Sequence, residues 1–520
     1  MIKNGIISSS HQLASFWGAK CLLDGGNVVD AALTTSAVLS VVQNNMCGLG
    51  GDMFALVKMG DRVTEINSSG RAAKLATIEL YSEKGFRKIP PTGPLGANTV
   101  PGMVKGWGDL HQRFCTREME SLLIPAINYA EHGFPITEKY SASIRGSVQS
   151  LGQFEGWREI FLPDGLIPEP GFNLRQKELA DSLRAIASQG VDDFYRGDLS
   201  RLLVSGIAKQ GGIITEEDLR DHESTWVERP LFTDYRGVRI YETSPNSQAA
   251  TVLLWLNMLE HYQLSEMDPN SKTFLEIMID TCLKAYEVRA RSIGDPRFFP
   301  LPPEFTSKQF SEDLLAQEPF RKSEPISKPK APQGDTTYFA VADSEGNCVS
   351  VIQSNYMGFG SGLVPKGTGI VLHDRGCYFS LDPSHHNSLS PGKRTFHTLC
   401  ASLGVQDGET LFAIGSMGGD VQPQIHVQLM TQLLDFHSDL QRAIDNPRWI
   451  IPMTIYDQPS TVYREFDQAI VKDAAVKRNL RFETLGGLSS LCGHAQAIFR
   501  NSDGLFGAAD PRGDGASVGF

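Results

Sequence analysis

The sequence has no long hydrophobic run. Its longest apolar-leaning stretch, residues 31–42, is interrupted by hydroxyl side chains. A membrane-spanning helix needs roughly 20 apolar residues, so this stretch predicts a buried helix and no membrane anchor. The N-terminal segment also lacks the apolar core of a signal peptide. We therefore expect a cytoplasmic protein.

The sequence also has no excess of positively charged residues. The 520 residues include 48 Lys and Arg against 60 Asp and Glu, for a net charge of −12, and no basic run stands out. This balance argues against nucleic acid or an anionic membrane as the main partner. With 41% hydrophobic and 21% charged residues, the composition is typical of a soluble globular enzyme.

Cysteine is sparse, and its spacing excludes two kinds of site. The eight cysteines include no pair at the two-residue spacing of a metal-binding motif, and their density is far below that of a disulfide scaffold. Ser384-His385-His386 lacks a third ligand at a suitable spacing and is better explained as a solvated loop. We expect buried reduced thiols, no metal and no cofactor.

The chain divides into a helical-leaning first part and a strand-leaning second part, joined by the proline-rich residues 291–335. No repeat of fixed period is present, and the order of elements favours mixed α/β layers. The predicted helices are 12–24, a second one capped by Asn27 and Asp30, 274–290 and 424–437, within a mainly helical region from about 120 to 290. The predicted strands form hairpins over 54–66, 338–354 and 493–511, with a further strand over 409–416.

Two adjacent threonines, Thr336 and Thr337, follow the connector directly and begin a predicted strand. A threonine hydroxyl is a poor nucleophile near pH 7. A chain cut before Thr336 would free its α-amine, whose pKa of about 7.7–8 suits a general base. That design needs a flexible loop before the residue and a rigid strand after it, and both are predicted here. The threonine pair alone does not establish a nucleophile, because β-propensity also favours threonine at a strand start.

Further segments, in a fixed order, carry a resemblance to a known family. They are GGNVVDAA (25–32), GLGGDMF (48–54), VPGMVKGW (100–107), GGIITEEDL (211–219), YRGVRIYETSP (235–245), TTYFAVADSEGNCVSVIQSNYMGFGSGLVPKGTGI (336–370), GSMGGD (415–420), AIDNPRW (443–449) and AADPR (508–512). Over essentially its whole length, the chain resembles the γ-glutamyltranspeptidase family of N-terminal-nucleophile hydrolases, in a divergent, acylase-like branch.

The resemblance implies an α+β fold, the four-layer αββα sandwich of these hydrolases. It also implies a proenzyme that cuts itself between Asp335 and Thr336. Residues 1–335 would form a large-subunit segment and residues 336–520 a small-subunit segment, interlocked as one structural unit. The sequence leaves open whether the processed pair assembles further into a homo-oligomer.

Carried over by position, the resemblance also implies the catalytic residues. Thr336 is the expected nucleophile, forming an acyl-enzyme ester, and Ser354 occupies the place of a hydroxyl that hydrogen-bonds it. Gly418 and Gly419 match the paired glycines whose N–H groups hold the oxyanion. For Thr337 a structural role is expected. The glycines of residues 48–52 lack the ending of a phosphate loop, so we expect a close-packed turn there.

Substrate recognition is where the sequence departs from the family. A γ-glutamyl donor presents a carboxylate, which suits arginine and amide or hydroxyl donors, and an ammonium, which suits an acid. The usual acid is missing, and Asp374 and Asp420 are candidates to replace it. The expected substrate-binding residues are Arg71, Asn355, Tyr356, Arg375, Tyr378, His397 and Thr398. The alternatives are structural ion pairs for the two arginines and a satisfied core histidine at His397.

These residues predict an autoprocessed hydrolase or transferase for small-molecule γ-glutamyl amides such as glutathione. The short loop after Phe379 predicts an open site, in which water competes well with acceptor amines. An acylase for glutaryl or other carboxylated acyl groups is the first alternative. An uncleaved pseudoenzyme that only binds ligands is the second.

Overall fold

Two antiparallel sheets form the centre of the molecule. The computed structural model describes residues 4–317, 334–466 and 469–520. The first sheet has the order β18 (Ala516–Gly519), β1 (Gly5–Ser9), β9 (Asp335–Asp343), β10 (Cys348–Tyr356), β2 (Asp52–Met59), β3 (Arg62–Ser68) and β6 (Thr225–Val227). The second has the order β17 (Gly504–Ala509), β16 (Ala495–Asn501), β12 (Glu409–Ser416), β11 (Ala401–Gln406), β8 (Val238–Glu242) and β7 (Leu231–Tyr235).

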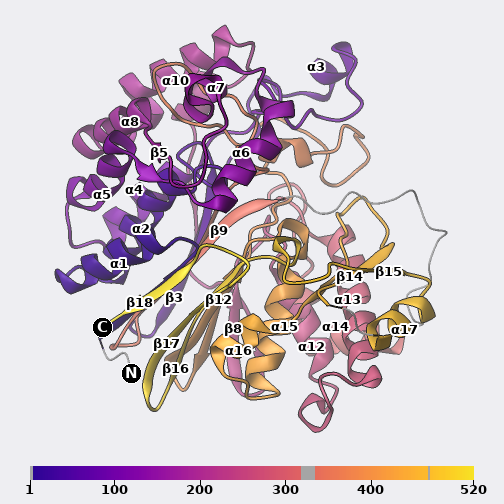
Figure 1. The fold of residues 1–520 in the computed structure, drawn as a ribbon. Coiled ribbons are helices and arrows are strands. Elements are labelled where there is room, and N and C mark those ends of the chain that lie inside the picture. The colour runs from indigo at the N-terminus through magenta and orange to yellow at the C-terminus, as the bar shows by residue number, and fades with distance from the viewer. Residues whose placement is uncertain (1–3, 318–333, 467–468) are drawn as a thin grey trace.

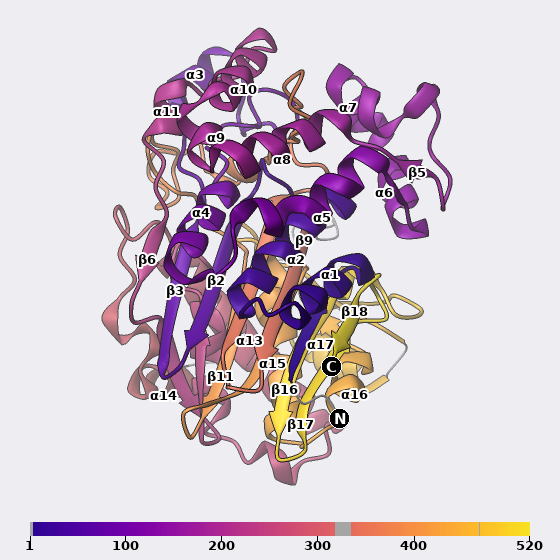
Figure 2. The same ribbon diagram turned by 90° about the vertical axis from the view of Figure 1, so that its left-hand side faces the viewer.

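A helical layer covers the outer face of each sheet (Figures 1 and 2). Over the first sheet lie α1 (Gln12–Leu23), α2 (Val28–Val42), α4 (Met103–Phe114), α5 (Met119–His132) and α8 (Lys177–Gln189), with α3 (Ile78–Glu83), α6 (Glu138–Leu151), α7 (Glu155–Phe161), α9 (Asp192–Arg196), α10 (Asp198–Lys209) and α11 (Glu216–Arg220) beyond them. The second layer holds α12 (Ala250–Leu259), α13 (Lys272–Ser292), α14 (Lys308–Ala316), α15 (Gln422–Leu434), α16 (Leu440–Asp445) and α17 (Ala469–Lys477). Two small sheets, β4 (Phe134–Pro135) with β5 (Asn173–Leu174) and β13 (Trp449–Ile450) with β14 (Thr461–Arg464) and β15 (Arg481–Thr484), complete the fold.

Strand alternation explains why the molecule has four layers. In β9, Tyr338 and Ala340 point into the core between the two sheets, whereas Phe339 and Val341 point into the core under the first helical layer. Successive strand residues face opposite sides, so a strand that is apolar throughout must be covered on both faces. The αββα sandwich implied by the resemblance is therefore confirmed.

Local sequence signals account for many of the elements. Asn27 and Asp30 form the predicted capping box at the start of α2. The hairpin of β9 and β10 turns at residues 344–347, and the hairpin of β2 and β3 turns at Gly60 and Asp61, as predicted. Residues 225–242 differ from the expected helical region, because they form the edge strands β6 and β7 and the neighbouring strand β8. These strands are short and are flanked in the chain by long helical stretches, whose periodicity dominates the hydrophobic pattern of the region.

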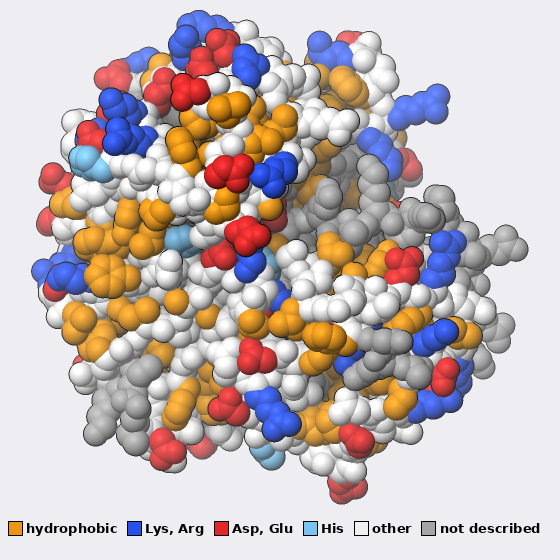
Figure 3. All heavy atoms as spheres, viewed as in Figure 1, with side chains coloured by type: hydrophobic (Ala, Val, Ile, Leu, Met, Phe, Trp, Pro, Cys, Tyr) orange, Lys and Arg blue, Asp and Glu red, His pale blue; other side chains and the backbone are white. Residues whose placement is uncertain are grey.

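The part of the chain that the structure describes contains no helix both long and apolar enough to cross a membrane. On the face shown in Figure 3, acidic and basic side chains are interspersed, and neither sign forms a continuous patch.

Candidate active site

Thr336 lies at the start of β9, in the middle of the first sheet, and is 3% exposed. Its Oγ1 donates a hydrogen bond to Ser354 Oγ at 3.1 Å. Ser354 Oγ in turn donates to the backbone carbonyl of Asp335 at 2.6 Å. A single hydroxyl thus bridges the predicted nucleophile and the carbonyl of the peptide bond before it.

The backbone around Ser354 is irregular. A register shift lies between Gln353 and Tyr356 where β10 pairs with β9. Tyr356 has a φ of 77°, which is unfavourable for a residue with a large side chain. In this conformation its N–H donates to Ser354 Oγ at 2.7 Å, so the hydroxyl has one acceptor and two donors around it. This set uses the full hydrogen-bonding capacity of a serine hydroxyl.

The glycine pair Gly418–Gly419 lies directly beside the predicted cleavage point. A Cβ added to Gly334 would come within 3.1 Å of Gly419 Cα and 3.3 Å of its nitrogen. Both paired glycines have positive φ, 138° and 56°, which glycine adopts without a steric penalty. Within the described residues, neither N–H of the pair donates a hydrogen bond, so both are available to an oxyanion.

Residues far away in sequence hold this glycine turn. Gln248 Nε2 donates to Gly419 O at 2.9 Å, and Tyr286 Oη donates to Asp420 O at 2.8 Å. The Asp420 carboxylate accepts from Tyr378 Oη at 2.6 Å and pairs with Arg289 at 3.3 Å. Asp420 therefore has its partners inside the protein. Sequence reasoning missed Gln248 and Arg289, because nothing in their local sequence links them to the turn.

A pocket of about 640 Å³ opens onto the predicted cleavage point. Its lining includes Asp335, Asp374, Gly418 and Leu491. Burial raises the pKa of Asp335 to about 6 and that of Asp374 to about 7. Asp374 Oδ1 accepts from Met357 N–H at 3.1 Å, whereas its buried Oδ2 has no hydrogen-bond partner in the described part of the chain.

Four of the expected substrate-binding residues form one cluster. The Arg375 guanidinium lies 3.4 Å from the centre of the Tyr356 ring and 4.8 Å from that of Tyr378. Its Nη1 donates to Thr398 Oγ1 at 2.9 Å. Arg375 is 1% exposed, yet its Nε and Nη2 have no acceptor among residues 4–317, 334–466 and 469–520. A buried guanidinium with two free donors is well suited to a carboxylate ligand.

Comparison with known proteins identifies the family of the chain. A family model described as "Gamma-glutamyltranspeptidase" matches residues 14–520. The chain belongs to this family.

Three relatives show where the chain lies within the family. It is 37% identical over 521 residues to the glutathione hydrolase-like YwrD proenzyme of Bacillus subtilis (strain 168), covering 99% of this chain and 98% of that protein. It is 36% identical over 531 residues to the oxamate amidohydrolase proenzyme of Klebsiella pneumoniae subsp. pneumoniae, with the same two coverages. The solved cephalosporin acylase from Bacillus halodurans matches with a TM-score of 0.91 at 33% identity, covering 100% of this chain and 96% of that one. These relatives fit a divergent, acylase-like branch.

Arg71 and Asn355 do not join the Arg375 cluster. Arg71 pairs with Asp295 at 3.4 Å, an arrangement that matches the structural alternative. The Asn355 amide donates to Asn44 O at 3.2 Å and lies against the turn at residues 48–51. Neither residue lines the pocket at Asp335. Arg375 is not among its lining residues either, but it directly follows the lining residue Asp374 in the chain.

His397 belongs to a buried network around Asp52. Its Nε2 lies 3.1 Å from Asp52 Oδ2, and its Nδ1 accepts from the N–H of Leu399 at 3.3 Å. Burial lowers the pKa of His397 to about 4, so the ring is neutral at pH 7. His373 also contacts Asp52, at 3.4 Å. This placement matches a satisfied core histidine, and no sequence signal had linked Asp52 to it.

The glycine-rich residues 48–52 form a close-packed turn, as expected. A Cβ on Gly50 would lie 2.1 Å from Val371 O, and one on Gly51 would lie 2.5 Å from Ser354 O. Within the described residues, no group of three or more His, Cys, Asp or Glu side chains could hold a metal ion.

Proposed function

We propose that the chain is a proenzyme that cuts itself between Asp335 and Thr336 and then hydrolyses amides whose acyl group carries a carboxylate. The observation that supports this most strongly is the Ser354 hydroxyl, which bridges Thr336 Oγ1 and the Asp335 carbonyl. Residues 1–335 and 336–520 would be the two products.

Self-cleavage would begin when Thr336 Oγ1 attacks the carbonyl carbon of Asp335. Ser354 donates to the carbonyl oxygen, so it opposes the negative charge that develops there. The C–N bond breaks as the proton given up by Oγ1 passes to the departing nitrogen, and residue 335 is left as an ester on the threonine. Water then hydrolyses this ester, which yields the carboxylate of Asp335 and the free α-amine of Thr336.

The Thr336 hydroxyl would also be the nucleophile of the mature enzyme. The freed α-amine takes the proton from Oγ1 as it attacks the substrate amide. The N–H groups of Gly418 and Gly419 stabilise the tetrahedral oxyanion, and the leaving amine takes up the proton. A second attack, by water, releases the acyl group, and an acceptor amine in place of water would give transfer. The access of water to the open pocket favours hydrolysis.

Arg375 would select the acyl group. Its two free nitrogens suit the carboxylate of a γ-glutamyl donor, and Tyr356 and Tyr378 fix the guanidinium by stacking. The related YwrD protein, named glutathione hydrolase-like, supports γ-glutamyl amides as the first candidates.

A second candidate is an acyl group with a carboxylate but no amine, such as glutaryl. The partners of Asp420 inside the protein favour this reading, because Arg289 and Tyr378 already occupy its carboxylate. Burial also raises the pKa of Asp374 to about 7, so this carboxyl group is only partly ionised at neutral pH and is a poor partner for an ammonium group. The relatives named oxamate amidohydrolase and cephalosporin acylase agree with such a preference.

The test of processing is the intact mass of the purified protein under denaturing conditions, beside a Thr336→Ala variant. We expect two fragments from the parent, the second beginning at Thr336, and one uncut chain from the variant. A parent that stays at full mass after long incubation would support the ligand-binding pseudoenzyme instead.

Specificity is tested with γ-glutamyl and glutaryl p-nitroanilides. We expect Arg375→Gln to lower kcat/KM for both by about 10²-fold, because the substrate carboxylate loses its charged partner. Hexanoyl p-nitroanilide, an acyl group without a carboxylate, is the matched control and should be affected less than threefold. Equal losses on all three substrates would show that Arg375 supports the site structurally instead of reading the carboxylate.

A further inference from the structure

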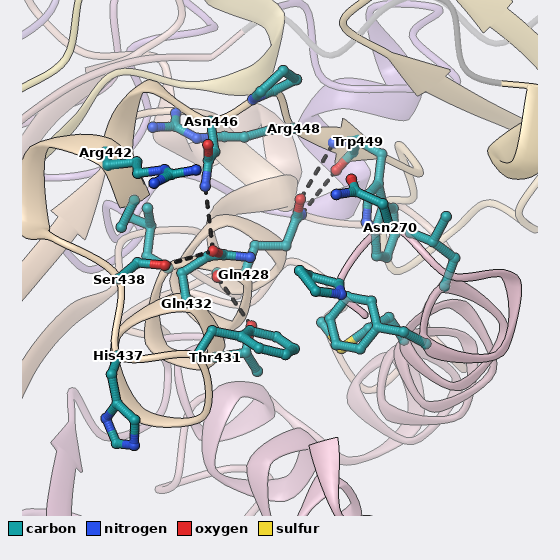
Figure 4. Close-up of a pocket in the computed structure, with 18 of the residues that line it drawn as sticks. Asn270, Gln428, Thr431, Gln432, His437, Ser438, Arg442, Asn446, Arg448 and Trp449 are labelled. Carbon is teal, nitrogen blue, oxygen red and sulfur yellow. Dashed lines mark hydrogen bonds between the residues drawn. The ribbon is translucent and has the colours of Figure 1, made fainter. Parts of the chain in front are cut away.

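A second pocket lies in the outer helical layer of the second sheet, among α13, α15, α16 and β13 (Figure 4). Its volume is about 530 Å³, within the range of small-molecule sites. It shares no lining residue with the pocket at Asp335. The proposed amide hydrolysis therefore leaves this second pocket unexplained.

One wall of the pocket is apolar. Phe274, Leu275 and Met278 from α13 face Leu429 from α15 and Trp449 from β13. All five side chains are buried in the protein core, so this wall is well fixed. Such a wall suits the hydrocarbon or aromatic body of a ligand.

Arg464, at the end of β14, brings a buried positive charge to the same pocket. The residue is only 6% exposed. In the described part of the chain its guanidinium donates no hydrogen bond and forms no ion pair, and its Nε is fully buried without an acceptor. The Glu465 carboxylate lies near enough to favour the charged form of Arg464, but it is already paired with Arg512. A buried charge of this kind is unfavourable unless an anion pairs with it. An anionic ligand group would provide such a pairing.

A second guanidinium, that of Arg442 on α16, lies at the exposed rim. It too has no carboxylate partner within the described residues. Arg448, in contrast, is neutralised by Asp510 at 2.6 Å. Asp439 is the one acid among the lining residues, and its carboxylate caps α16 by accepting N–H groups from that helix. The lining therefore holds one acid against the two guanidinium groups of Arg442 and Arg464, neither of which forms an ion pair within the described residues.

Amide side chains complete the polar side. Gln432 Oε1 accepts from Ser438 Oγ at 3.0 Å and from Asn446 Nδ2 at 3.2 Å. Figure 4 shows Gln432 between these two partners, with Arg442 and Asn446 on the same side and His437 pointing away. The Gln432 Oε1 atom is thus occupied, and its amide nitrogen remains available to donate.

We propose that this pocket binds a small carboxylate with an apolar body. The carboxylate pairs with Arg464 and Arg442, and the body packs against Phe274, Met278 and Trp449. The site is separate from the amide-cleaving centre and does not depend on the proposed reaction.

The test is calorimetric titration of the mature protein with 4-phenylbutyrate. The control is 4-phenylbutan-1-ol, which has the same body and no charge. We expect one site for the carboxylate and about tenfold weaker binding of the alcohol. Arg464→Gln and Arg442→Gln should each weaken carboxylate binding about tenfold, whereas Arg375→Gln, near the proposed amide-cleaving centre, should leave it unchanged.

Melting temperatures of the variants separate loss of the site from loss of the fold. Arg442 is exposed, so its variant should melt like the parent. An unchanged affinity in Arg442→Gln overturns the proposal even where Arg464→Gln fails to fold. Loss of binding in Arg375→Gln, or no binding to the parent at millimolar 4-phenylbutyrate, overturns it as well.

Discussion

Among single residues, Ser354 has the most central position in the candidate active site. Its hydroxyl receives hydrogen bonds from Thr336 and from the backbone of Tyr356, and it donates to the Asp335 carbonyl. One side chain can therefore act in both stages: it polarises the carbonyl in the precursor and orients the threonine in the mature enzyme.

Replacing this hydroxyl should slow self-cleavage. In Ser354→Ala the developing oxyanion on residue 335 loses its donor, which we expect to reduce the cleavage rate by about 10²- to 10³-fold. Ser354→Thr keeps the hydroxyl and is the matched variant, expected to cleave within about tenfold of the parent. The measurement is a time course of the uncut band on denaturing gels from the moment of synthesis. If Ser354→Ala matures at the parental rate, Ser354 has no role in the cleavage step.

The candidate site residues that the sequence indicated, and that the structure brings together, lie inside continuous motifs. Thr336 and Ser354 sit on one hairpin, and Gly418–Gly419 follow one strand, so each had a local signal. Gln248 is different, because it holds Gly419 from 171 positions away. An ion pair was the sequence-based alternative for Arg71, but its partner Asp295, 224 positions distant, had no local signal. Contacts of this kind depend on packing and not on local pattern.

Among the elements, the turn at residues 48–51 supports the end of β10. A Cβ at Gly51 would lie 2.5 Å from Ser354 O and 2.7 Å from Asn355 Oδ1. Real Cβ atoms do not approach backbone so closely, and therefore only glycine allows this packing. The turn that resembles a phosphate loop in sequence has a structural explanation here.

A methyl group in this turn should disturb both stability and maturation. We expect Gly51→Ala to destabilise the protein by about 1–3 kcal/mol through overpacking, and to slow self-cleavage because it displaces Ser354. The control is Gly146→Ala in α6, where nothing lies within 4 Å and alanine favours the helix. Chemical unfolding and the gel time course give the two readouts. Parental behaviour of Gly51→Ala in both would contradict the close packing.

Element boundaries were predictable where pattern and packing agree. The β9–β10 hairpin, the capped start of α2 and strand β12 all appear where the sequence indicates. Strands β7 and β8 do not, because each has only five residues, and β8 joins the sheet by pairing with the distant β11. Long-range pairing of this kind leaves little trace in local periodicity.

At the scale of the whole molecule, the two segments on either side of Thr336 share both sheets. In the first sheet, β9 and β10 from residues 335–356 lie between β1 and β2 of the first segment, and β18 pairs with β1 from the outside. In the second sheet, β11 pairs with β8 of the first segment. Separation would break the ladders of both sheets and expose the core between them.

The cut protein should therefore remain one particle. We expect the two fragments to elute together in native size-exclusion chromatography, at the position of the uncut Thr336→Ala variant, and to separate only in denaturant. The physical reason is that cleavage removes one peptide bond at the start of β9, between Asp335 and Thr336, while the pairings of residues 337–343 with β1 and β10 are kept. The eluted peak, run on a denaturing gel, should contain both fragments in equal molar amounts. Fragments that elute apart without denaturant would show that the shared sheets do not hold the segments together after cleavage.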